Sequence, residues 1–427
     1  MLLTLALLCS VPVSIPGPLS GPDDWCGWRG PRGDGTAPGS PPIEWSEQKN
    51  VRWRADLPGA GLSSPIIWGE QVFVTTAVPT GKKRAGVVSE FFRQPYELEE
   101  QECLVLAFAR GDGKELWRKR VAQAFPHEPT HPTNTYATPT PATDGERVYC
   151  SFGSFGLYAL TPAGELVWQV DLGDLSNHGH GEGSSPIVYD GSVIVLWAHW
   201  GESFLIALDG ASGRERWRTP LPQGNNCSTP LVVHVEGEDQ LVIAGSQTFG
   251  CDPKTGRVLW AFGEEGGGNT SMASPVAIGE LVLVPAVDRG DMLALVAMPG
   301  GEPAEMLWSR RSSDNIPSLL AWQQKVIFLK GDSGQLTVID CVSGEADYGP
   351  ERLQGVSEAW ASPVVAGGRL YVAGRDGRVE VLALTPEVRS LAVNELEDGF
   401  DASPAVAGNE LYLRGKSHLF CLAEPAK

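Results

Sequence analysis

One stretch of sequence, SPIVYDGSVIVLWAHWGESFLIALDGASGRERWR at residues 185–218, decides the fold. Its apolar runs, among them residues 193–196 and 204–208, are separated by the turn residues Asp190-Gly191 and Ala211-Ser-Gly213. Short apolar runs bounded by Gly and Asp turns predict four β-strands joined by tight connections. Nowhere does the chain show a capped, amphipathic stretch long enough to predict a helix.

The same order of strands recurs along the chain. A small residue meets a proline or serine just before an apolar run at eight anchors: Ser64-Pro65, Thr140-Pro141, Ser185-Pro186, Thr229-Pro230, Ser274-Pro275, Pro317-Ser318, Ser362-Pro363 and Ser403-Pro404. From the second anchor on, the spacing is 41 to 45 residues, which predicts a stacked or radial array of repeats. Four-stranded units of this length are typical of β-propeller blades, which bury their apolar faces against one another.

The two ends of the chain predict how the ring closes. The last unit, which follows Ser403-Pro404, lacks a fourth strand bearing a tryptophan. Residues 50–57 resemble such a strand in isolation, because Val51-Arg-Trp-Arg54 matches Glu215-Arg-Trp-Arg218. We therefore predict an all-β, eight-bladed propeller of four-stranded antiparallel blades, in which residues 50–57 complete the C-terminal blade and remove two sheet edges.

The domain organisation follows from these boundaries. Residues 1–20 are expected to be a signal segment, residues 21–48 an extended N-terminal segment, and residues 49–427 the propeller, with an insertion at 77–103 in the first blade. The apolar run at the start resembles the core of a signal peptide, and no later segment is apolar for long enough to cross a bilayer. An exported protein, periplasmic or extracellular, is expected. The insertion should open onto the same face as the loops that enter the innermost strands.

Charge and motifs exclude several classes of function. Fifty-two acidic against 33 basic residues give a net charge of −19, which argues against binding to nucleic acid. No GxSxG, HExxH or phosphate-loop motif supports hydrolase or nucleotide chemistry. The eight cysteines show no CxxC spacing, so buried thiols are expected and no metal site.

Six tryptophans recur at one position of the repeat and are expected to have a structural role. They should wedge between neighbouring blades, with each indole N–H bonded to a backbone acceptor. These residues are Trp53, Trp117, Trp168, Trp217, Trp260 and Trp308.

Four segments resemble a known family. The turn and tryptophan strand at 207–217, with its relatives at 111–117 and 254–260, resembles the tryptophan-docking repeat of pyrroloquinoline quinone (PQQ)-type propellers. The opening Trp25-Cys-Gly-Trp-Arg-Gly-Pro-Arg-Gly-Asp-Gly35 resembles the start of the PQQ-like propellers abundant in planctomycete-type bacteria. This resemblance is specific for the fold and weak for the activity.

The resemblance implies two classes of function. In quinoprotein dehydrogenases, PQQ with a calcium ion oxidises alcohols or sugars, whereas cofactor-free propellers include the assembly lipoprotein of the outer-membrane β-barrel machinery. Many quinoprotein alcohol dehydrogenases carry an adjacent cysteine pair beside the quinone and are longer than this chain, which has no such pair. We therefore predict a monomeric, non-catalytic scaffold at the cell envelope that needs no cofactor and binds an unidentified protein or small ligand. The alternative is a dehydrogenase that uses PQQ and Ca²⁺.

A site of either kind is expected where the loops entering the innermost strands converge on one mouth of the central channel. Candidate residues for binding a ligand or partner there are Asn134, Tyr136, His178, His180, Asn269, Asn315 and Asp401. For the quinone alternative, Glu182 with Asn225 or Asn226 would offer oxygen ligands to Ca²⁺, and Trp360 would stack on a planar ring. A third interpretation is that these Asn, Asp and His side chains only satisfy the backbone of turns. No catalytic base can be assigned from the sequence.

Overall fold

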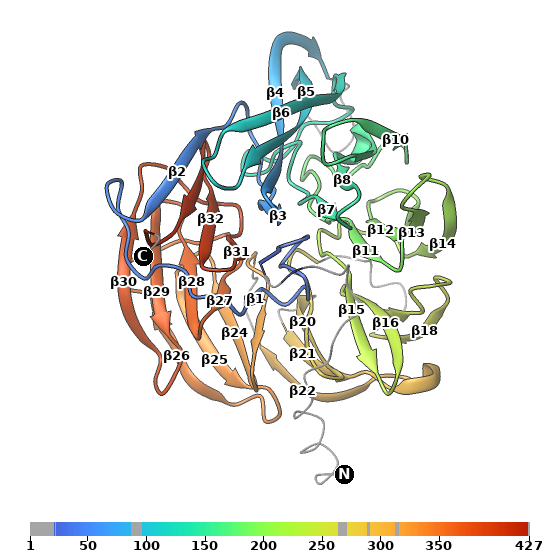
Figure 1. The fold of residues 1–427 in the computed structure, drawn as a ribbon. Helices are drawn as coiled ribbons and strands as arrows, with labels where there is room; N and C mark the ends of the chain where they lie inside the picture. The colour runs from blue at the N-terminus through green and yellow to red at the C-terminus, as the bar shows by residue number, and fades with distance from the viewer. Residues whose placement is uncertain are drawn as a thin grey trace.

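The computed structural model describes residues 21, 23–86, 96–263, 271–287, 291–311 and 316–425. Eight sheets stand around a central axis, each with its innermost strand at the channel (Figure 1). Seven sheets follow the chain order: β3 (Ile66–Trp68), β4 (Gln71–Ala85), β5 (Glu97–Ala109), β6 (Glu115–Ala124); β7 (Ala142–Thr143), β8 (Val148–Ser151), β9 (Leu157–Leu160), β10 (Leu166–Val170); β11 (Ile187–Tyr189), β12 (Ser192–Trp197), β13 (Ser203–Asp209), β14 (Glu215–Leu221); β15 (Leu231–Val235), β16 (Glu238–Ile243), β17 (Thr248–Cys251), β18 (Val258–Phe262); β19 (Val276–Ile278), β20 (Leu281–Val287), β21 (Asp291–Val296), β22 (Glu305–Arg311); β23 (Leu320–Trp322), β24 (Lys325–Lys330), β25 (Gln335–Asp340), β26 (Ala346–Arg352); β27 (Val364–Ala366), β28 (Arg369–Ala373), β29 (Arg378–Ala383), β30 (Arg389–Glu395). Two short 3-10 turns, η1 (Gly153–Phe155) and η3 (Pro299–Gly301), lie between strands.

The eighth blade joins the two ends of the chain. Its inner strands are β31 (Ala405–Ala407), β32 (Glu410–Arg414) and β33 (His418–Leu422), and its outer strand is β2 (Val51–Asp56). The two ends pair antiparallel, with Trp53 opposite Cys421. The predicted eight-bladed propeller, closed by the N-terminal strand, is therefore confirmed.

The eight anchors form a hydrogen-bonded ring around the channel. At seven junctions, the backbone N–H of one anchor donates to the side-chain hydroxyl of the anchor in the next blade, at 2.8 to 3.0 Å. The series runs Ser64, Thr140, Ser185, Thr229, Ser274, Ser318, Ser362 and Ser403. Each anchor is at most 6% exposed, so these bonds satisfy buried backbone donors that would otherwise destabilise the fold.

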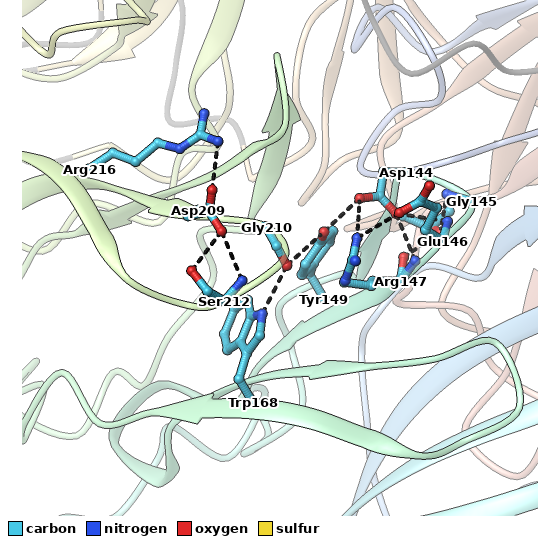
Figure 2. A network of polar contacts seen from close by, with 11 residues as sticks. Asp144, Gly145, Glu146, Arg147, Tyr149, Trp168, Asp209, Gly210, Ser212 and Arg216 are labelled. Carbon is cyan, nitrogen blue, oxygen red and sulfur yellow. Dashed lines mark hydrogen bonds and ion pairs between the residues drawn. The ribbon is translucent and has the colours of Figure 1, made fainter.

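Tryptophans of the outer strands lie against the turns of the next blade. Figure 2 shows Trp168 of β10, whose indole N–H donates to the carbonyl of Gly210 at 2.9 Å. Tyr149 donates to the same carbonyl at 3.3 Å and to Asp144 at 2.6 Å. The indole of Trp168 covers Gly213, where the left-handed backbone (φ +70°) and the close ring leave no room for a side chain.

The other five tryptophans follow this arrangement to different degrees. The indoles of Trp53, Trp117 and Trp308 donate to carbonyls of the following blade, at 2.7 to 2.9 Å. The indole of Trp217 covers Gly256 in a turn of the next blade, but the buried indole N–H has no acceptor among the described residues. Trp260 differs, because its N–H donates at 2.7 Å to Gln240 within its own blade.

The insertion in the first blade is a continuation of the sheet. Strands β4 and β5 stay paired from Gln71 opposite Ala109 out to Ala85 opposite Glu97, beyond the length of the other blades. Arg84 near the end of this hairpin donates to the carbonyl of Pro126 at 3.1 Å and lies 4.8 Å from the ring centre of Phe125. The hairpin therefore packs against the loop that leads to the channel mouth.

The N-terminal segment crosses the channel on the inner side of the anchor ring. Trp25 pairs with Ile67 of β3, and β1 (Thr36–Ala37) adds a parallel strand to β27 on the other side of the ring. Between them, Trp28 donates to the hydroxyl of Ser274 at 3.1 Å. This segment, drawn in dark blue at the centre of Figure 1, forms the floor beneath the channel mouth. The predicted signal segment, residues 1–20, lies outside the described residues.

Two further observations concern the cysteines and the hydropathy of the chain. The seven described cysteines are free thiols, and burial raises the pKa of Cys26 and Cys227 to about 12. In the described part of the chain, no helix is long and apolar enough to cross a membrane.

Candidate functional site

A chamber of about 480 Å³ lies at the channel mouth, above Trp28. Its wall has two layers, because residues two apart on an extended chain point the same way. The lower layer contains the anchor hydroxyls. The upper layer consists of the residues two positions before the eight anchors: Leu62, Thr138, Gly183, Cys227, Met272, Ile316, Trp360 and Asp401. Three consecutive blades thus contribute large apolar side chains, Met272, Ile316 and Trp360, and the remaining blades contribute smaller or polar ones.

Trp360 and Asp401, two predicted site residues, meet at the chamber through Arg375. The guanidinium carbon of Arg375 lies 3.6 Å from the ring centre of Trp360. Its Nε donates to Asp401 at 2.7 Å, and its Nη1 donates to Glu358 at 2.8 Å. Arg375 therefore covers one face of the indole and shares its single positive charge between two carboxylates, Asp401 and Glu358.

Two histidines and an asparagine form the opposite rim. The rings of His131 and His180 are stacked, with centres 6.2 Å apart, and both line the chamber. The amide of Asn134 donates to the carbonyls of His180 and Glu182, at 2.8 and 3.1 Å. Asn134 thus joins two mouth loops, while the imidazole of His180 makes no hydrogen bond with the described residues.

Glu182 turns its carboxylate away from the channel axis, against the neighbouring blade. It accepts from the backbone N–H of Ser154 at 3.0 Å and lies beside Gly153. Burial, followed by the nearby Glu128, raises the pKa of Glu182 to about 7. The hydroxyl of Tyr136 donates to the carbonyl of Glu128 at 3.2 Å, so Tyr136 belongs to this side pocket, outside the chamber.

Asn225 and Asn226 do not join Glu182. The Nδ2 of Asn226 donates to the carbonyl of Ala244 at 2.6 Å, and its Oδ1 accepts from Ser228 at 2.6 and 2.9 Å. The Oδ1 of Asn225 lies 3.6 Å from the thiol of Cys227, and neither asparagine lines the chamber. Among the residues described, no three His, Cys, Asp or Glu side chains converge in a metal-binding group. The side chains proposed for Ca²⁺ thus do not fit that ion in their present arrangement.

The remaining predicted residues lie elsewhere. His178 stacks on the exposed Trp200 at the outer rim, with ring centres 5.6 Å apart. Asn269 and Asn315 lie outside the described residues. Sequence reasoning missed Trp28, Arg375 and, apart from Trp360 and Asp401, the layer two positions before each anchor. The regular spacing of the anchors could have predicted this layer, because side chains two residues apart on an extended chain point to the same side.

The fold and this chamber together define an eight-bladed β-propeller with a cavity at one mouth of its channel. The family described as outer membrane protein assembly factor BamB matches residues 43–169, 101–346 and 154–424. These overlapping matches cover most of the sequence, and the chain belongs to this family of PQQ-like propellers.

Solved structures of similar fold come from both functional classes. BamB from Moraxella catarrhalis is 15% identical with a TM-score of 0.56, covering 83% of this chain and 99% of that one. Quinohemoprotein alcohol dehydrogenase from Comamonas testosteroni is 12% identical with a TM-score of 0.64, covering 95% and 81%. The quinohemoprotein alcohol dehydrogenase ADHIIG from Pseudomonas putida HK5 is 12% identical with a TM-score of 0.57, covering 97% and 84%. No curated protein matches the sequence. At these identities the similarity shows the fold alone.

Proposed function

We propose that this chain is a non-catalytic binding protein of the cell envelope, whose chamber receives a small ligand or a segment of a protein partner. The chamber volume lies within the range of about 300 to 1,000 Å³ typical of ligand pockets. Its wall combines apolar side chains with a few polar groups, as ligand sites do. The envelope location is supported by the family description, which refers to the assembly of outer membrane proteins.

One observation supports the non-catalytic assignment: three of the described polar side chains that are candidates for a quinone site are already engaged. Glu182 is held by Ser154, Asn226 by Ala244, and Asp401 by Arg375. A Ca²⁺ ion needs six to eight oxygen ligands, and an unengaged carboxylate would be needed to take the proton of a substrate hydroxyl. The alternative, a PQQ- and Ca²⁺-dependent dehydrogenase, would require these side chains to exchange their partners.

Titration of the purified protein with PQQ, with and without Ca²⁺, tests the assignment. We expect no calcium-dependent heat of binding, and no reduction of a dye when alcohols and sugars are supplied. Glu182→Gln serves as the matched variant, because it keeps the acceptor for Ser154 and removes the charge. Tight, calcium-dependent binding of PQQ that is lost in this variant would overturn the proposal.

The location requires its own measurement. Fractionation of cells that express the tagged chain should recover it with the envelope. Recovery of the folded protein from the cytoplasm would contradict that part of the proposal.

A further inference from the structure

The anchor hydroxyls have hydrogen-bonding capacity that the fold does not use. The hydroxyl oxygen of each anchor from Thr140 to Ser403 accepts a hydrogen bond from a backbone N–H. The O–H proton of the same hydroxyl has no acceptor among the described residues. These seven side chains line the chamber and are 1 to 6% exposed. A buried hydroxyl has one donor to satisfy, so the lower wall of the chamber presents donors to whatever binds there.

A buried cation lies directly beneath one part of this ring. Arg29 is 2% exposed, and it donates to the carbonyls of Leu319 at 2.7 Å and Pro363 at 3.0 Å. These residues immediately follow the anchors Ser318 and Ser362. In the described part of the chain, Arg29 has no carboxylate partner, and its Nε has no acceptor.

A second buried cation adjoins the ring at its closing junction. Arg414 is also 2% exposed, donates to the carbonyl of Ser63 at 3.1 Å, and contacts the hydroxyl of that residue. Its Nε also lacks an acceptor, and none of the described acidic residues forms an ion pair with it. Asp34, which pairs with Arg32, also acts electrostatically on Arg29, but neither buried guanidinium forms an ion pair of its own among the described residues. Both therefore place positive charge beside the ring in a setting of low dielectric.

The apolar arc of the wall stands over the same anchors. Met272, Ile316 and Trp360 precede Ser274, Ser318 and Ser362 by two residues, so each apolar side chain lies above a hydroxyl. Met272 and Ile316 are 45% and 47% exposed. Such exposure of large apolar groups beside a cavity marks a surface that a ligand covers.

The acidic side chains at the chamber have partners outside the ring of hydroxyls. Asp401 and Glu358 share Arg375, which offsets one of their two charges, and the carboxylate of Glu182 points toward Ser154 in the neighbouring blade. The arc over Ser318 and Ser362 therefore combines hydroxyl donors, a buried cation and apolar cover, and none of the described acidic side chains forms a hydrogen bond with its hydroxyls.

We propose that the chamber binds a carboxylate attached to an apolar or aromatic body. The carboxylate accepts from the hydroxyls of Ser318 and Ser362 above Arg29, and the body packs on Met272, Ile316 and Trp360. Hydrogen bonds to an ionised acceptor are roughly twice as strong as neutral ones, so the charge should dominate recognition. This inference deepens the proposed binding function and depends on it.

Calorimetric titration of the full chain with phenylacetate, and with its neutral isostere phenylacetamide, tests the ligand class. We expect the carboxylate to bind at least about tenfold more tightly than the amide, which corresponds to about 1.4 kcal/mol. Equal affinities, or no binding of either compound, would overturn the proposal. PQQ also carries carboxylates on an aromatic body, so its binding without Ca²⁺ would accord with this inference. Only calcium-dependent binding and dye reduction test the non-catalytic assignment, so the two proposals can be judged separately.

Ile316 offers a matched pair of variants with little risk to the fold, because its side chain is half-exposed. Ile316→Glu places a negative charge above Ser318 and should weaken phenylacetate binding at least about tenfold, since like charges repel strongly in a partly buried site. Ile316→Gln, of similar size and uncharged, should retain most of the affinity. Equal losses in both variants would show that the charge of the ligand is not recognised at this arc.

Discussion

A comparison of two tryptophans at the same blade position gives the sharpest test of how the blades are joined. Trp168 and Trp217 each cover a turn glycine, Gly213 and Gly256 respectively. The N–H of Trp168 donates to the carbonyl of Gly210 at 2.9 Å, whereas the buried N–H of Trp217 has no acceptor among the described residues. Replacement by Phe removes the N–H in both cases and leaves an aromatic ring, so the loss of packing largely cancels in the comparison.

The expected difference in unfolding free energy is about 2 kcal/mol. Trp168→Phe loses a hydrogen bond with a net value of about 1 kcal/mol, and Trp217→Phe removes a buried donor whose unpaired burial costs about 1 kcal/mol or more. Equilibrium unfolding in urea, followed by far-UV circular dichroism, measures both variants without relying on tryptophan fluorescence. If Trp217→Phe destabilises as much as Trp168→Phe, indole hydrogen bonds do not contribute to the stability of the blade junctions.

Three further predictions concern the ring, a turn and a buried acid. Thr229→Val, which keeps the shape but removes the hydroxyl that accepts the N–H of the preceding anchor, should lower the free energy of unfolding by about 1 to 3 kcal/mol; Thr229→Ser should be close to wild type in the same urea titration. Gly213→Ala places a Cβ on a left-handed backbone, 2.8 Å from the ring of Trp168, whereas a Cβ at Gly111 would have nothing within 4 Å. The urea concentration at the midpoint of unfolding should therefore fall further in Gly213→Ala than in Gly111→Ala. Because the pKa of Glu182 is raised from 4.5 to about 7, the folded protein holds more protons than the unfolded chain between those values and loses stability as the pH rises across them. Glu182→Gln should remove this contribution to the change of unfolding free energy with pH. If urea midpoints measured over a pH series change equally in the wild type and in Glu182→Gln, the prediction is wrong.

The sequence predicts the ring of blades well because the determining features are local and repeated. Eight anchors specify eight innermost strands, and the similarity of residues 51–54 to 215–218 identifies the closing strand. The N-terminal segment could not be placed in the same way. Its path across the channel depends on single contacts, such as that of Arg29 with Leu319 and Pro363, which no period along the chain reveals.

The candidate site was predictable at the level of loops and not of side chains. The loops that enter the innermost strands do converge, and they bring His180, Trp360 and Asp401 to one chamber. The direction of each side chain depends on neighbours distant in sequence. Glu182 faces Ser154 and Asn226 binds Ala244, because buried carboxylates and amides take the nearest backbone partner that satisfies them.

The closure of the ring by β2 has a consequence for the order in which the protein can fold. Trp53 and its partner Cys421 are 368 positions apart (421 − 53). Strand β2 is therefore synthesised early but cannot pair until almost the whole chain is available. Forming contacts of such long range closes a very large loop, and the entropic cost of that closure slows the final step of folding. During that interval β33 in the last blade and β2 itself each retain an unpaired edge, which is a template for pairing with other chains. A chain that crosses a membrane before folding would complete this step on the far side, where a chaperone that covers strand edges would speed maturation more than one that binds apolar surface.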